Sequence, residues 1–278
     1  MPDTPAKPVL LTGASGALGR ILVRSLGALG WRLVLTDIAP FPDALPAGAA
    51  FTRADLCDGV AMLRLAEGCG TIVHLGGVSV ERPFEEVIGP NIRGLYHVYE
   101  AARREKARVI FASSNHSVGF HERTETLPVD TAFLPDGYYG LSKAYGELMG
   151  RMYWFKHGVE SVNLRIGSAF PEPVNARMLA SWLSYDDFSR LIERAVLAPS
   201  VGCVVIWGAS KNARMTWWRD DARAALGWAP VDSADPFAGQ LAAAVSGDPV
   251  EERYMGGAYC SIEYTRDAPA PVWGAGDV

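Results

Sequence analysis

A tyrosine and a lysine four residues apart are the side chains of this 278-residue chain best suited to chemistry: Tyr139 and Lys143, in the segment YGLSK. On a helix, positions i and i+4 project from one face, so we expect the ammonium to lie close to the phenol. A nearby cation favours the phenolate and lowers a tyrosine pKa from its ordinary ~10 toward the range of a useful general base. A surface helix pair has the same spacing, so the assignment depends on what accompanies it.

A polar stretch, FASSNH, follows a predicted strand and ends at His116. In parallel α/β sheets, ligands bind beyond the carboxyl ends of the strands. We therefore expect Ser114 to hydrogen-bond the oxygen at the reacting carbon, with Ser113, Asn115 and His116 in the same crevice. Taken alone, the stretch is also consistent with a turn or a helix cap. No second histidine pairs with His116 as a metal site, and no acid and serine spacing forms a hydrolytic triad.

A glycine-rich turn, TGASGALG, lies between an apolar strand and an amphipathic helix. This context is the one a dinucleotide fingerprint requires. Gly13 permits the tight turn, Gly16 lets the backbone approach a pyrophosphate, and Gly19 allows close packing of helix on sheet. The phosphates then meet the free N–H groups and the positive end of the helix dipole. The turn predicts a dinucleotide site.

The acid that ends the next predicted strand, Asp37, stands 18 residues after Gly19. A carboxylate there accepts hydrogen bonds from ribose hydroxyls and repels a 2′-phosphate. The one basic residue that we count nearby is Arg32, inside the strand. We therefore predict NAD rather than NADP. Asp55 and Leu56 end another short segment and are placed beside the adenine, with a plain polar loop as the alternative.

The elements that must position these residues alternate between short apolar runs and helical patterns over residues 1–166. This alternation predicts an α/β fold, a Rossmann-type doubly wound parallel sheet. After Gly167, prolines break the pattern, so residues 167–278 are expected to form a smaller, irregular substrate-binding portion with a loose tail. The predicted strands are 9–12, 32–36, 71–75, 108–112, 161–166 and 203–207, and the predicted helices are 18–29, 91–106, 140–156 and, for the most part, 177–197.

The composition excludes several classes of protein. A formal net charge of −5 argues against a general nucleic-acid binder. Four scattered cysteines without a CxxC pair predict neither a zinc site nor a disulfide framework, and they suit a reducing compartment. We see no signal peptide and no apolar run of the ~18–20 residues that cross a bilayer. A cytoplasmic protein without a metal or a membrane partner is expected.

Taken together, these motifs resemble the extended short-chain dehydrogenase/reductase superfamily, and more closely its uronate dehydrogenases. The likeness extends from about residue 10 to about residue 210, and nothing after about residue 267 contributes to it. Asn91 matches the usual helix asparagine of the superfamily, but Pro90 precedes it, so the helix is expected to start slightly differently. The closer match is carried by the stretches IVHLGGVSVERPFE, FASSNHSVG, PDGYYGLSK, RIGSAFPEPVNARML, WLSYDDF and GCVVIWGAS.

The resemblance implies NAD-dependent oxidation of the anomeric carbon of D-glucuronate or D-galacturonate to the aldarolactone. It makes Tyr139 the general base, Lys143 its electrostatic partner and ribose anchor, and Ser114 the residue that positions the hydroxyl. The expected cofactor-binding residues are Gly13, Ser15, Gly16, Ala17, Leu18, Gly19, Asp37, Ile38, Asp55, Leu56, Leu75, Gly76, Gly77, Asn91, Ser113, Tyr139, Lys143 and Ile166. The expected substrate-binding residues are Ser79, Ser114, Asn115, His116, Tyr139, Ser168 and Arg177.

Arg177 suits the carboxylate of such a substrate. It follows a proline-flanked loop just beyond the strand that ends at Ile166. Its planar guanidinium offers a two-pronged contact to a carboxylate. The alternative is a solvated helix arginine.

Two other functions remain open. A sugar-nucleotide epimerase or dehydratase has the same fold and Tyr-Lys pair, but it needs a larger C-terminal portion than the roughly 110 residues after Gly167. A non-catalytic NAD-sensing protein should have lost the Tyr-Lys pair. A homo-oligomer is expected because assembly is common in the superfamily. The sequence favours neither glucuronate nor galacturonate. Four tryptophans are assigned to packing or to a subunit interface: Trp207, Trp217, Trp218 and Trp228.

Overall fold

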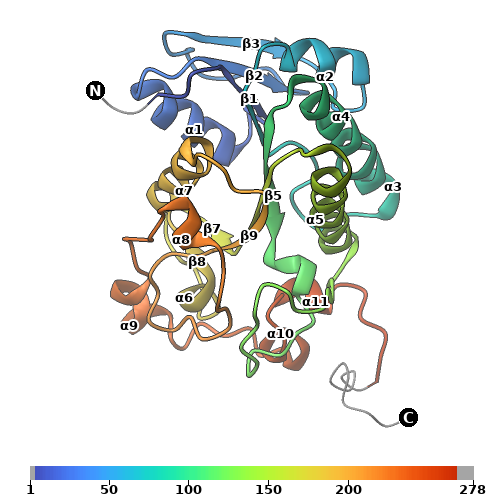
Figure 1. The fold of residues 1–278 in the computed structure, drawn as a ribbon. Helices are drawn as coiled ribbons and strands as arrows, with labels where there is room; N and C mark the ends of the chain where they lie inside the picture. Colours follow the sequence, from blue (N-terminus) through green and yellow to red (C-terminus); the bar gives the residue numbers. More distant parts are fainter. Residues whose placement is uncertain (1–3, 268–278) are drawn as a thin grey trace.

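The computed structural model describes residues 4–267, in which seven strands form one parallel sheet in the order β3-β2-β1-β4-β5-β6-β9 (Figure 1). The order reverses between β1 and β4, which is the switch point of a doubly wound sheet. The predicted Rossmann-type fold is confirmed. The strands are β1 Val9–Thr12, β2 Leu33–Asp37, β3 Ala49–Arg53, β4 Thr71–His74, β5 Arg108–Ser114, β6 Ser161–Ile166 and β9 Cys203–Gly208.

Helices cover both faces of this sheet (Figure 1). Helices α1 (Ala17–Ala28) and α7 (Tyr185–Leu197) pack against each other and bury one apolar core. On the other face, α2 (Gly59–Ala66), α4 (Leu95–Glu105) and α5 (Tyr138–His157) bury a second core. Strands covered on both faces read as continuous apolar runs, and β1 is buried along its whole length.

The spacing of apolar residues explains why these helices form. In α1 the buried positions are Gly19, Leu22, Val23 and Leu26, which repeat at i, i+3, i+4 and i+7. This stripe faces the sheet and α7, while the polar residues of the helix face outward. The helix therefore comes directly out of the glycine turn and fixes where that turn points.

The helix predicted for residues 91–106 starts earlier and is irregular, so that prediction was wrong at its beginning. The chain forms α3 (Phe84–Val87), then a wide π-helical segment, η1 (Ile88–Gly94), and only then α4. Pro90 lies inside η1 and has no N–H to donate, so a regular α-helical ladder cannot pass through it. The sequence analysis also predicted neither the strand β3 nor the helix α2.

The chain after residue 167 contributes to the main sheet as well as to the irregular portion. Strand β9 pairs with β6 and completes the sheet. The segment 177–197 is interrupted, because Trp182–Leu183 are extended and pair with Ser168–Ala169. The boundary at residue 167 stays a prediction. The smaller elements are η2 Asn115–Val118, β7 Ser168–Ala169, α6 Met178–Ser181, β8 Trp182–Leu183, α8 Arg223–Leu226, η3 Asp235–Phe237, α9 Ala238–Leu241, α10 Pro249–Arg253 and α11 Ala258–Ser261.

The four tryptophans are buried and serve packing. Trp207, Trp217 and Trp218 share one core cluster, while Trp228 joins the core under α1 and α7. Among the described residues, no helix combines the length and apolarity that a membrane span requires.

Candidate active site

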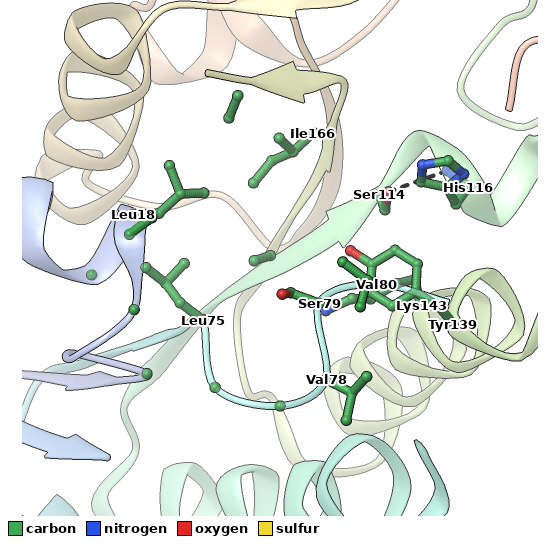
Figure 2. A pocket seen from close by; sticks show the side chains of 18 of the residues that line it. Leu18, Leu75, Val78, Ser79, Val80, Ser114, His116, Tyr139, Lys143 and Ile166 are labelled. Atoms are coloured by element: carbon green, nitrogen blue, oxygen red, sulfur yellow. Dashed lines mark hydrogen bonds between the residues drawn. The ribbon is translucent and has the colours of Figure 1, made fainter. Parts of the chain in front are cut away.

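A cavity of about 910 Å³ lies beyond the carboxyl ends of β1, β4, β5 and β6. Figure 2 shows Leu18 and Leu75 in one part of it and Tyr139, Lys143 and Ser114 in another. All the expected site residues line the cavity except two, Asn91 and Asn115. The fold thus brings together residues from segments more than 150 positions apart along the chain, such as Gly13 and Arg177.

Two glycines of the turn at one end of the cavity, Gly13 and Gly19, have no room for a side chain. Gly13 has φ +73°, and a Cβ on it would lie 2.7 Å from the backbone nitrogen of Gly76. A Cβ on Gly19 would lie 2.1 Å from the carbonyl oxygen of Gly13. Helix α1 begins at N-cap Gly16 with no side-chain cap and no acid in its first turn, so its free N–H groups remain for an anion. This arrangement fits the pyrophosphate of a dinucleotide.

Asp37 is held at the edge of this end by backbone amides. Its Oδ2 accepts a hydrogen bond from the Ser15 amide and its Oδ1 from the Ala39 amide, both at 3.0 Å. Our count of nearby basic residues was wrong, because Arg53 of β3 pairs in register with Asp37 and its Nε donates to the carbonyl of Ile38. The strand β3 was not predicted, so this neighbour was invisible in the sequence.

Asn91 does not line the cavity, and its expected contact with the cofactor stays a prediction. Its Oδ1 accepts from the Val78 amide (2.8 Å), and its Nδ2 donates to the Val78 carbonyl (3.0 Å) and to Ser142 Oγ (2.9 Å). It therefore ties the loop after β4 to α5. The serine of YGLSK, Ser142, is the partner of Asn91 on α5, and the sequence analysis assigned it no role.

Tyr139 and Lys143 occupy successive turns of α5, as the spacing predicted. The Lys143 Nζ lies 5.3 Å from the centre of the Tyr139 ring and 5.0 Å from that of Phe111. Burial raises the pKa of Tyr139, and its hydrogen bond with Ser114 offsets part of that rise. Burial also lowers the pKa of Lys143 to about 8. The net shift is opposite to the expected lowering, because desolvation at this phenol outweighs the effect of the nearby cation.

A carboxylate from another segment holds the start of α5. The two oxygens of Glu81 accept the amide protons of Tyr138 and Tyr139, each at 2.9 Å. The N-cap residue, Gly137, has no side chain to do this, and a Cβ there would lie 2.3 Å from Glu81 Oε2. Glu81 was missed because it stands 58 residues before Tyr139.

The two serines at the end of β5 have different surroundings. The Ser113 hydroxyl donates to Glu147, which forms an ion pair with Arg165 in which each side chain is 1% exposed. Ser113 therefore lines the cavity but directs its hydroxyl elsewhere, which qualifies its expected cofactor contact. Ser114 hydrogen-bonds Tyr139. Successive strand residues alternate faces, so one of the two had to point away.

His116 contacts a carboxylate and two aromatic rings that the sequence analysis did not connect with it. Its Nδ1 lies 2.6 Å from Oδ2 of Asp136, whose side chain is fully buried. Its ring stacks on Tyr259, with 4.0 Å between ring centres, and meets Tyr139 edge-on. Asp136 looked like an ordinary turn residue in the sequence PDG, and Tyr259 comes from an irregular region without a pattern.

Arg177 is fixed on three sides. Its Nε donates to the Met255 carbonyl (2.7 Å) and its Nη1 to Ser168 Oγ (3.1 Å). Its Nη2 donates to the Asn115 amide oxygen (2.7 Å), in the orientation of that amide that also lets Asn115 donate to the Ile166 carbonyl. Asn115 therefore positions Arg177 and does not itself line the cavity, and its expected contact with the substrate stays a prediction. Burial lowers the pKa of Arg177 to about 10.

The remaining N–H groups of Arg177 are suited to an anion. No carboxylate within residues 4–267 lies within 4 Å of its guanidinium. Each terminal nitrogen carries two N–H groups and uses one of them, so each keeps one for a ligand. The arginine lines the cavity, so this two-pronged donor is available there.

A Rossmann sheet with a dinucleotide turn, an acid at the end of β2 and a Tyr-Lys-Ser set is the architecture of an enzyme that uses a nicotinamide dinucleotide, either a dehydrogenase or an epimerase or dehydratase. The sequence model of the NAD dependent epimerase/dehydratase family matches residues 9–225, and the chain belongs to that family. The protein is an NAD-dependent dehydrogenase, and the relatives below agree with this assignment.

The uronate dehydrogenase of Pseudomonas syringae pv. tomato is 47% identical over 261 residues, which cover 92% of this chain and 94% of the relative. That of Pseudomonas putida is 45% identical, covering 93% and 97%. The crystal structure of uronate dehydrogenase from Agrobacterium tumefaciens has a TM-score of 0.86 and 44% identity, covering 91% and 96%. A tyrosine-to-alanine variant of that enzyme, complexed with NAD, also has a TM-score of 0.86, with 43% identity over 93% and 97% of the two chains.

Proposed function

We propose that this dehydrogenase oxidises the anomeric carbon of a hexuronate, D-glucuronate or D-galacturonate, to the aldarolactone. The observation that carries the proposal is Arg177, a half-buried cation that lines the cavity without a carboxylate partner within 4 Å among the described residues. A substrate carboxylate would supply the missing charge. The names of the similar enzymes support the same substrate class.

The proposed reaction divides between the cofactor and three side chains. NAD, when bound, accepts the hydrogen of C1 together with its electron pair. Tyr139 takes the proton of the C1 hydroxyl, and Ser114 hydrogen-bonds the same oxygen as it becomes the lactone carbonyl. Lys143 anchors the nicotinamide ribose and favours the charged form of Tyr139.

The two ends of the substrate are served by adjacent residues. Ser114 touches Tyr139, and the next residue, Asn115, touches Arg177. The end of β5 therefore sets the distance between the base and the carboxylate-binding arginine. A rigid spacing of this kind favours one length of substrate, because orientation of the reacting carbon depends on both contacts.

Steady-state kinetics with NAD test this proposal. We expect turnover of glucuronate and galacturonate, with the matching neutral sugars, glucose and galactose, used far less efficiently. The product is followed by NMR as a lactone. Turnover of neutral aldoses as efficient as that of uronates would refute the uronate assignment. Activity confined to UDP-sugars would favour the epimerase or dehydratase alternative.

We also propose that the enzyme assembles as a homo-oligomer through the outer face of α5. Leu141, Leu148, Met152 and Phe155 are 46–80% exposed and lie on one helical stripe. Exposed apolar patches of this kind mark interaction surfaces.

Light scattering should give an oligomer for the native enzyme and a smaller species for a Leu148→Glu/Phe155→Glu variant. Val231→Glu, at an exposed valine elsewhere, is the control. A monomeric native enzyme would rule out the assembly.

A further inference from the structure

Asp136 is a buried carboxylate with an incomplete set of hydrogen bonds. Its side chain is fully buried, and Oδ2 is paired with His116 Nδ1. Its other oxygen, Oδ1, has no hydrogen-bond partner within residues 4–267. Burying a carboxylate that is only half satisfied lowers stability. Such an arrangement is typical of functional sites rather than of cores.

The space around this carboxylate is shaped for aspartate. A Cβ on Gly119 would lie 2.0 Å from Asp136 Oδ2, and one on Gly256 would lie 1.9 Å from the same atom. A Cβ on Gly140 would lie 2.9 Å from Oδ1. Gly119, Gly140 and Gly256 therefore leave room for a carboxylate at this point, directly before α5.

The contact determines which nitrogen of His116 carries a proton. An ionised carboxylate only accepts hydrogen bonds, so Nδ1 must donate to it. In the neutral ring, Nε2 is then an acceptor. His116 lines the cavity beside Ser114 (Figure 2), and its Nε2 makes no hydrogen bond to a described residue. Stacking on Tyr259 restricts rotation of the ring.

We infer that Asp136 is a positioning residue that holds His116 in the Nδ1–H form, so that Nε2 accepts a hydrogen bond from a hydroxyl of the sugar ring. The inference rests on the proposed function, because a pyranose offers such a hydroxyl next to the reacting carbon. The inference adds a requirement on the ligand beyond the carboxylate that Arg177 would bind. The ligand must carry a donor at this position as well as a carboxylate.

An Asp136→Asn variant tests the inference with little change in shape. The asparagine amide can donate to Nδ1, which would leave the proton on Nε2 and turn the acceptor into a donor. We expect kcat/KM for uronates to fall roughly 10- to 100-fold, mainly through KM, because two donors then face each other. The melting temperature and Kd for NAD should stay close to those of the native enzyme. Asp130→Asn, an exposed aspartate on the preceding loop, is the matched control.

A double-mutant cycle separates positioning from a structural role. His116→Phe retains an aromatic ring to stack on Tyr259 but has no nitrogen. In that background, Asp136→Asn should cause no further loss of kcat/KM if Asp136 acts through His116. Losses that multiply in the double variant would overturn the inference, since Asp136 would then act independently of the histidine.

Nitrogen-15 NMR of the full-length protein gives a readout that does not depend on uronate turnover. The signal of His116, assigned by its loss in His116→Phe, should show the proton on Nδ1 in the native enzyme and on Nε2 in Asp136→Asn. A native Nε2–H form would overturn the inference whatever the substrate. The expected tautomer without uronate turnover would leave the positioning role intact and refute only the proposed function.

Discussion

Asp37 and Arg53 occupy paired positions on the neighbouring strands β2 and β3. Two backbone amides hold the Asp37 carboxylate at the edge of the cavity. The Arg53 guanidinium donates to the carbonyl of Ile38, and Arg53 does not line the cavity. A negative group thus stands at the edge of the cavity, with a positive group at the paired position of the neighbouring strand. We expect the balance between these two charges to determine how well a cofactor with a 2′-phosphate, NADP, binds relative to NAD.

Removing the carboxylate should therefore relax cofactor choice. In the native enzyme we expect kcat/KM to be high with NAD and low with NADP. Asp37→Asn should raise efficiency with NADP, because Arg53 is already in place to attract the phosphate. Adding Arg53→Gln to that variant should remove most of the gain. Equal efficiency with both cofactors in the native enzyme would show that Asp37 does not contact the ribose.

Tyr139→Phe removes the titrating hydroxyl and leaves the ring in place. Loss of a general base typically lowers the rate by ~10²–10⁴-fold, so kcat should fall by that order. Binding of NAD should barely change, because the glycine turn and Asp37 lie at the other end of the cavity. Single-turnover kinetics and NAD titration measure both effects. Retention of more than about half the native rate would exclude Tyr139 as the base.

Lys143 should lower the stability of the protein while serving its activity. Because burial lowers its pKa in the folded protein to about 8, the folded state is disfavoured wherever the amine must be charged. Below about pH 8 the full penalty applies. It disappears as the pH rises toward the pKa that the lysine has in the unfolded chain. Lys143→Met should therefore melt at a higher temperature than the native enzyme at pH 7, in the absence of NAD. That difference should shrink by pH 10, and a constant difference would contradict the assignment.

Arg177→Met should raise KM for uronates strongly, since a hydrogen bond to a charged group contributes about 1.5–3 kcal/mol. Some kcat should also be lost, because remote binding energy helps to orient the reacting carbon. Arg177→Lys should recover only part of the activity, since an ammonium lacks the two-pronged geometry. The measurement is kcat/KM for galacturonate and galactose, with Arg214→Met as an exposed control. An equal loss for both sugars would make Arg177 structural.

Glu81→Gln should lower the free energy of unfolding by about 1 kcal/mol, the usual size of a helix-cap effect. A glutamine keeps one acceptor oxygen but turns an NH₂ group toward one amide of Tyr138 or Tyr139. The start of α5 should then shift, and kcat should fall more than KM rises. Thermal melting and kinetics together test this, with the exposed Glu67→Gln as the control. Lost stability with unchanged kcat would restrict Glu81 to a structural role.

Local motifs account for what the sequence by itself determined. The glycine turn, Asp37 and the Tyr139–Lys143 pair are each defined within one turn, one strand end or one helix, and hydrophobic periodicity places those elements. Because a parallel sheet brings the carboxyl ends of its strands to one edge, the shared site followed from the order of elements. The helix predicted to begin at residue 91 begins differently, because the π-helical segment η1, which contains Pro90, precedes α4.

Only the tertiary structure decided which distant residues support those motifs. Glu81 meets α5, Tyr259 stacks on His116, and Arg53 lies beside Asp37 through contacts between separate segments. No local pattern encodes such contacts, because each depends on how loops pack after the sheet has formed. The same holds for the two serines of β5: alternation required one to face away from the cavity, and the buried Glu147–Arg165 pair determined that it was Ser113.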